Sequence, residues 1–178
     1  MNSTTAGWLV LLAAGLIAVV QMGYYGPQLP PEVASEFDFQ GRASGWTSKT
    51  CLVLVHTGTM LAMAAFPVLL GWLIRVLPLW AIDMPHKEYW LAPERRRQTA
   101  RLVSPYLAWL FAATALLVTG IFQFTYLANL GHPQAMRRPP LALLGMYGVF
   151  VLVWIVAFYR RFRLPKQGCP VPPRTPPP

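Results

Sequence analysis

Four long runs of apolar residues, separated by polar connections, dominate the hydrophobic pattern of the chain. They cover residues 8–25, 50–77, 102–128 and 141–159. Each holds about 18 residues or more, enough for a helix to cross roughly 30 Å of hydrocarbon. The runs are continuous rather than alternating, which argues against the strands of a membrane barrel. We therefore predict an all-α bundle of four membrane-spanning helices.

The composition supports this class. Of the 178 residues, 55% are hydrophobic and only 12% are charged, whereas soluble domains average about 25% charged residues. No Lys or Arg precedes the first run and no small-x-small cleavage site follows it, so we expect a retained anchor rather than a signal peptide. Residues 1–163 are predicted to form the membrane domain. Residues 164–178 contain seven prolines and are predicted to be a disordered or extended tail.

The distribution of Lys and Arg predicts the orientation. With four spans, the N-terminus, the second connection and the tail share one side, which carries eleven of the 15 cations. The positive-inside rule then places both termini in the cytoplasm and residues 26–49 outside, in a multi-pass protein of the bacterial inner membrane. The net charge of +9 is explained by a cytoplasmic face lying against anionic lipid, without a nucleic-acid partner.

The outer connection, residues 26–49, is rich in aromatic, acidic and turn-forming residues. We expect an ordered loop. In the recognition of a partner, Phe37, Phe39 and Trp46 would supply the buried contacts. The candidate interaction residues are Glu36, Phe37, Asp38, Gly41, Trp46 and Lys49. Two interpretations of the acids remain open: with Glu32 and His132 they bind a divalent cation, or they are solvated loop acids.

The inner connection, residues 78–101, combines aromatic side chains with a basic run. We expect its aromatic residues in the headgroup region, and Pro93 and Glu94 at the start of a short basic helix that leads into the third span. The candidate inner-face residues are His86, Tyr89, Trp90, Glu94, Arg95 and Arg96. The arginines suit either a phosphorylated ligand or, more simply, lipid headgroups.

His56 is the only imidazole well inside an apolar run. It shares one helix face with Met60 and Met63, at spacings of four and seven residues. Imidazole and thioether groups are ligands of soft metals. The alternative is a packed, hydrogen-bonded histidine that faces the bundle interior.

Two segments together resemble a known family. The run from Leu29-Pro30-Pro31 to Gly45-Trp46, followed by Ser48-Lys49, is similar to the pattern LP-x-x-V-x-x-HF-x-x-x-G-x-x-x-x-W-x-S-K. This pattern belongs to an uncharacterised bacterial membrane domain that also forms the N-terminal part of immunity proteins of the SdpI type. The segment from Met84 to Arg96 is similar to IPNKDYWLAPERR of stand-alone members. The resemblance covers roughly residues 8–101.

The chain departs from the family pattern at two positions and in length. Glu36 stands where the family usually has His, so a histidine-dependent role is not carried over, although Glu retains the capacity to bind a hard cation. His86 stands where Asn is usual. The large C-terminal domain of full immunity proteins is missing, so immunity does not transfer directly.

These observations lead to an expected function. We predict a non-enzymatic membrane protein without a cofactor. It recognises a peptide, lipid or membrane-protein partner through residues 26–49, in an immunity, envelope-stress or accessory-subunit role. The alternative is a small transporter or metal-handling protein that uses His56 with Met60 and Met63, or Glu36 with Asp38. No nucleophile with a spaced partner indicates an enzyme.

Overall fold

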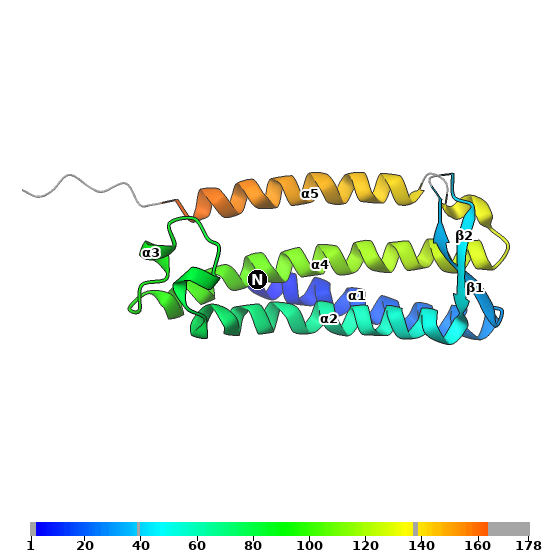
Figure 1. Ribbon diagram of the computed structural model, residues 1–178, viewed down its shortest axis with the longest axis horizontal. Helices are drawn as coiled ribbons and strands as arrows, with labels where there is room; N and C mark the ends of the chain where they lie inside the picture. Colours follow the sequence, from blue (N-terminus) through cyan, green and yellow to red (C-terminus); the bar gives the residue numbers. More distant parts are fainter. Residues whose placement is uncertain (1–2, 39, 137–138, 164–178) are drawn as a thin grey trace, which may run out of the picture.

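The computed structural model describes residues 3–38, 40–136 and 139–163 of the chain. Four long helices form an elongated antiparallel bundle (Figure 1). They are α1 (Ser3–Tyr25), α2 (Lys49–Val76), α4 (Arg96–Asn129) and α5 (Pro139–Arg161). All four are long and apolar enough to cross a membrane, which confirms the prediction of four long apolar helices.

Two of the helices extend well beyond the predicted apolar runs. Helix α1 begins five residues earlier than expected and α4 six residues earlier, at Arg96. The expected start of the basic helix was wrong: Pro93 and Glu94 lie in a turn before α4, not in its first turn. Helix α2 runs through Pro67 as one continuous helix.

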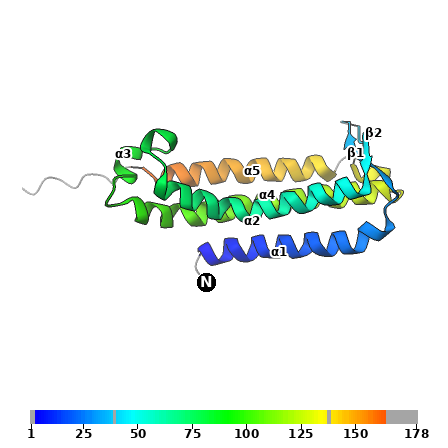
Figure 2. The same cartoon turned by 60° about the horizontal axis from the view of Figure 1, so that its bottom comes forward.

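The short elements lie at the two ends of the bundle. At one end, β1 (Glu32–Phe37) and β2 (Ala43–Ser48) form an antiparallel hairpin. At the other end lie α3 (Lys87–Trp90) and the 3-10 turn at Leu79–Ala81. The start of α1 and the end of α5 both point toward the α3 end (Figures 1 and 2). The 3-10 turns at Gly26–Gln28 and Pro133–Met136 complete the hairpin end.

Helix α4 is the centre of the bundle, and it packs against α1, α2 and α5. The α1–α4 interface is built from small residues: a Cβ added to Gly7 would lie 3.1 Å from the Cβ of Ala108. Such close approach is how helices associate in lipid, where the hydrophobic effect between them is lost. The other fully buried small residues at this interface include Ala14, Ala18 and Ala112. The sequence pattern did not reveal this interface, because the small residues lie on different helices.

Helix α5 is peripheral. None of its most apolar stretch is buried inside the protein, and large side chains such as Leu152 and Met146 are about two-thirds exposed. In a bilayer such residues face acyl chains, which are as apolar as leucine. The predicted tail, residues 164–178, lies outside the described residues.

Candidate functional site

The connection between α1 and α2 is a β-hairpin that is firmly attached to the helix ends. Val33 of β1 is fully buried and belongs to a cluster with Leu29, Leu52 and Tyr126. The N–H of Ala34 donates to Asn129 Oδ1 at 2.7 Å, and Asn129 Nδ2 donates to the Ala34 carbonyl at 2.9 Å. An asparagine near the end of α4 thus holds a strand that lies 95 residues away in the chain.

The tip of the hairpin is a turn closed by Asp38. Its Oδ1 accepts from the backbone N–H groups of Gln40 and Arg42, both at 2.8 Å. Gly41 has a φ of +76°, in the left-handed region where a side chain is strained. Asp38 and Gly41, predicted as interaction residues, therefore form the turn itself.

The acids of the hairpin point to different places. Glu36 lies over Gly45, since a Cβ added to that glycine would be 2.8 Å from Glu36 Oε2. Asp38 is turned into its own loop. Among the described residues no three His, Cys, Asp or Glu side chains come together in a way that could hold a metal ion, so the structure does not assemble Glu32, Glu36, Asp38 and His132 into such a group.

The aromatic residues of the hairpin differ in exposure. Phe37 is half-buried, whereas Trp46 is 62% exposed. We expect Trp46 to supply a contact that a bound partner buries, and in the described part of the chain its neighbour in the ladder is only the small Ala34. Phe39 lies outside the described residues. Lys49 closes the base of the hairpin, where its N–H donates to the Pro31 carbonyl at 2.9 Å.

Within the described part of the chain, the outer edge of β2 has no backbone hydrogen bond to another element. Both backbone groups of Ala34 bond to Asn129, so they point away from β2. In an antiparallel pair, opposite residues either bond across the ladder or both turn outward. Trp46 is opposite Ala34, so its N–H and C=O point outward along β2. Strand β2, ASGWTS, contains no charge and no proline, the features that commonly protect a strand edge from pairing.

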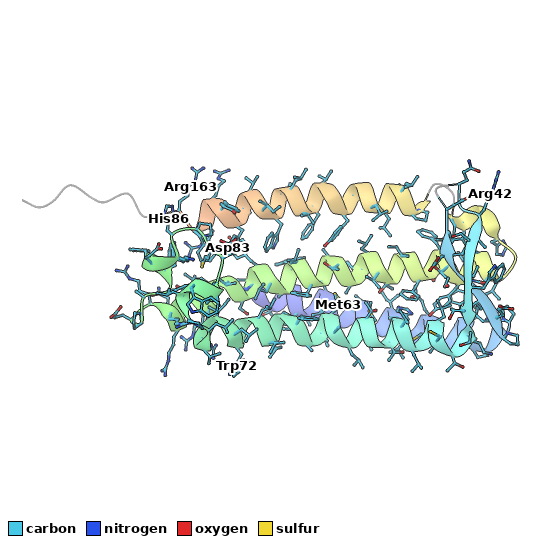
Figure 3. The ribbon with its side chains drawn as sticks, in the orientation of Figure 1. Arg42, Met63, Trp72, Asp83, His86 and Arg163 are labelled. Carbon is cyan, nitrogen blue, oxygen red and sulfur yellow. The ribbon has the colours of Figure 1, made fainter. Side chains whose placement is uncertain are left out.

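The inner-face motif lies at the opposite end of the bundle, where Figure 3 shows Asp83, His86 and Arg163 far from Arg42 of the hairpin. Arg96 donates through Nε to the Ile74 carbonyl at 2.7 Å and through a second nitrogen to the Leu77 carbonyl. These carbonyls lie at the C-terminal end of α2, where the helix leaves such groups unpaired. Arg96 is therefore a cap for α2.

Trp90 links this motif to two other helices. Its Nε1 donates to the Phe162 carbonyl after α5 at 2.9 Å, and its own carbonyl accepts from Thr99 Oγ1 at 2.6 Å. Its ring also packs edge-on against Phe162. The predicted placement of Trp90 as a headgroup anchor does not describe these contacts, which join the ends of α3, α4 and α5.

The remaining residues of the inner-face motif are more exposed. The guanidinium of Arg95 lies 4.1 Å from the ring centre of Tyr89, a cation–π contact. Glu94 is exposed. His86 has a φ of +53°, and both His and the Asn of the family pattern are enriched in this left-handed conformation. The change from Asn to His thus preserves a backbone preference.

A polar layer crosses the bundle below the hairpin. His56 is fully buried, as predicted for an ionisable group inside a span. Its Nδ1 is 2.8 Å from the Tyr126 hydroxyl, and its ring stacks on Phe122 with centroids 3.9 Å apart. Its Nε2 is buried and has no hydrogen-bond partner among the described residues.

A second hydrogen-bonded chain lies in the same layer. Gln21 Nε2 donates to Gln123 Oε1 at 2.9 Å and to the Thr119 carbonyl at 3.3 Å, and Gln123 Nε2 donates to the Tyr25 hydroxyl at 2.7 Å. Gln21 Oε1 is buried without a partner among the described residues. The polar residues were visible in the apolar runs, but sequence alone did not pair them across helices.

The two methionines predicted beside His56 have different surroundings. Met60 receives a long contact from Thr119 Oγ1, 3.7 Å from its sulfur. Met63 packs against the apolar cluster of Leu11, Ala14 and Ala112 near the middle of the bundle (Figure 3). Met60 packs against the same apolar cluster, as expected for two residues on one helix face, and it also contacts Thr119 of the polar layer.

Comparison with known proteins adds no assignment to this geometry. No protein-family model, no curated protein and no solved structure matches the chain. The resemblance to the uncharacterised membrane domain therefore stays a prediction that rests on the two motifs.

Proposed function

We propose that this protein is a non-enzymatic, multi-pass protein of the bacterial inner membrane that recognises a peptide or membrane-protein partner through its outer hairpin. The hairpin is held against the ends of α2 and α4, and it presents a free strand edge beside an exposed tryptophan. That single observation carries the proposal. A partner segment that pairs with β2 gains main-chain hydrogen bonds and a large aromatic contact.

The rigidity of the hairpin supports recognition rather than a spacer role. Val33 is buried under the strand, Asn129 holds Ala34, and Asp38 closes the turn. A surface that is ordered before binding loses less conformational entropy when the partner arrives. An immunity or accessory-subunit role is the expectation that the family resemblance adds.

The orientation rests on the charge distribution and needs its own test. A Ser44→Cys variant places a thiol on the hairpin, and a Glu94→Cys variant places one at the inner end, both in a background with Cys51 and Cys169 replaced by Ser. We expect a membrane-impermeant maleimide to label only Ser44→Cys in intact cells or spheroplasts. Labelling of Glu94→Cys alone would reverse the orientation.

The recognition surface is tested by affinity capture from membranes. We expect Trp46→Ala and Trp46→Pro to lose a partner that the unmodified protein recovers, because both remove the indole and Trp46→Pro also removes the outward N–H. Trp72→Ala is the matched control, since Trp72 is also exposed but lies on α2. If the set of recovered partners is the same for all variants, the hairpin is not the recognition surface.

A further inference from the structure

A groove between α4 and α5 lies near the α3 end of the bundle, and the proposed function does not use it. The two helices run antiparallel (Figure 1) and border a cavity of about 390 Å³, within the roughly 300 to 1,000 Å³ of small-ligand sites. Its walls are apolar or aromatic, formed for example by Leu102 and Trp109 of α4 and by Phe150 and Val153 of α5. Among the described residues that line it, only Arg161 is charged. We call this cavity the α4–α5 groove.

The α4–α5 groove has one charged end and one apolar end. Arg161 and Leu102 lie toward the α3 end, because α5 ends there and α4 begins there. Trp109 and Phe150 lie deeper in the bundle. Arg161 follows Phe150 by eleven residues, which corresponds to roughly 16 Å of helix. The groove therefore fits an elongated apolar molecule that carries its polar group at one end.

One wall of the groove is held in place by contacts between the two helices. Trp154 Nε1 donates to the Tyr106 carbonyl at 2.8 Å, and the two rings meet edge-on. Both residues line the groove. Phe158 stacks on Trp154 and packs edge-on against Tyr106. A wall that is ordered before a ligand arrives lowers the entropic cost of binding.

Arg161 is left without a protein partner. It is exposed in the last turn of α5, and its side chain forms no hydrogen bond or ion pair with a described residue. The arginines of the inner-face motif differ, because Arg96 caps α2 and Arg95 lies over the ring of Tyr89. A guanidinium binds phosphate through paired N–H donors. Arg161 therefore supplies a phosphate contact at the mouth of an apolar groove.

We infer that the α4–α5 groove binds one anionic phospholipid, with the phosphate on Arg161 and an acyl chain along the apolar walls. The charge of the groove is complementary to such a lipid, because its mouth is cationic and no acidic residue lines it in the described part of the chain. A zwitterionic lipid also has a phosphate, but it brings a cation close to Arg161 and to the neighbouring Arg160. The inference relies on the helices crossing a bilayer and not on the hairpin.

The test is native mass spectrometry of the full-length protein, delipidated in detergent and then titrated with phosphatidylglycerol or with phosphatidylcholine of the same acyl chains. We expect one phosphatidylglycerol per chain, bound about fivefold more tightly than phosphatidylcholine, as one cation beside an anionic lipid should produce. Equal retention of the two lipids, or retention of neither, would overturn the inference. A dimer peak in place of the lipid adduct would assign the groove to a second copy of the chain instead.

Two matched pairs of variants separate a defined site from general attraction to a basic surface. Arg161→Gln should weaken phosphatidylglycerol binding about fivefold. Arg160→Gln removes the same charge from an exposed neighbour that does not line the groove, and it should leave binding unchanged. Val153→Trp fills the groove and should displace the lipid, whereas Leu152→Trp adds the same bulk at an exposed position outside it.

Folding of each variant is checked by circular dichroism and by gel filtration. If the two arginine variants lose the lipid equally, binding follows the net charge of the surface and not Arg161. If the two tryptophan variants behave alike, the lipid does not lie in the groove. Arg161→Gln should leave partner capture by the hairpin unchanged, so this inference and the proposed function can fail separately.

Discussion

The two ends of the bundle both stand out in the sequence as dense polar and aromatic motifs, yet the structure uses them differently. At the α3 end, Arg96 and Trp90 donate to backbone carbonyls of α2 and of the segment after α5. At the hairpin end, Trp46 is exposed and the outer edge of β2 has no partner among the described residues. A segment dense in polar and aromatic residues is therefore not by itself a binding site. Only the groups that stay unpaired in the folded protein are available to a partner.

The largest effect should come from the cap at the inner end. Arg96→Met leaves the carbonyls of Ile74 and Leu77 without their donor, and a bond to a charged group contributes about 1.5 to 3 kcal/mol. We expect a loss of about 3 kcal/mol in unfolding free energy, measured by thermal or denaturant unfolding in detergent. Arg97→Met, at an exposed neighbour, should change stability by less than about 0.5 kcal/mol. Equal effects would remove the distinction between cap and surface.

The next effect should come from the attachment of the hairpin. Asn129→Ala removes both bonds to Ala34, at a cost of about 1 to 3 kcal/mol if the backbone groups stay buried. Hydrogen exchange should accelerate in β1 and β2, while exchange in α5 stays constant. Ser35→Ala, on the same strand, serves as the control. Uniform acceleration over all helices would mean that Asn129 stabilises the whole bundle instead.

A smaller effect is expected in the hairpin turn. Gly41→Ala forces a side chain into the left-handed region, which costs about 1 to 2 kcal/mol. Gly26→Ala is the control, because its φ is not positive and an added Cβ meets nothing within 4 Å. Unfolding of the hairpin, measured by hydrogen exchange of the amides in β1 and β2, should shift for Gly41→Ala only. Two equal shifts would show that the turn conformation is not the cause.

The smallest effect on stability should be at Trp46. Trp46→Ala should change unfolding free energy by less than about 0.5 kcal/mol, because the indole is mostly exposed. Trp90→Phe should lose about 1 kcal/mol with the bond to Phe162. In partner capture the order should be reversed: Trp46→Ala should lose the partner, and Trp90→Phe should retain it. A large stability loss for Trp46→Ala would contradict the idea that its indole is available to a partner.

Much of the bundle was predictable from the sequence, and the errors in the predicted helix bounds have a common cause. Hydropathy located all four helices because each must satisfy its backbone inside lipid. Residues 96–101 are mostly polar and lie outside the apolar run, and the predicted basic helix before the third run corresponds to these first turns of α4, with its start at Arg96 rather than at Pro93. The helix continues there because Arg96 caps α2 and Thr99 bonds to Trp90. These contacts lie between segments that no local pattern connects.

The candidate sites were also predictable only in part: spacing along one helix was visible in the sequence, and contacts between helices were not. The i, i+4, i+7 spacing placed His56, Met60 and Met63 on one face, as helix geometry requires. It did not show which methionine borders the polar layer, because that depends on how α1 and α4 pack on α2. Phe122 and Tyr126 come from α4, so only the packing of α4 on α2 brings them to His56.

The sequence by itself determined four apolar helices, an ordered segment between the first two, and a histidine that must face the interior, because each follows from the cost of polar groups in lipid. The tertiary structure decided that residues 32–48 form a hairpin whose β2 edge bonds to no other described element, that Arg96 and Trp90 bond to backbone, and that His56 bonds to Tyr126. Those outcomes depend on hydrogen bonds and close packing between helices, and such contacts leave no trace in the order of residues along one helix.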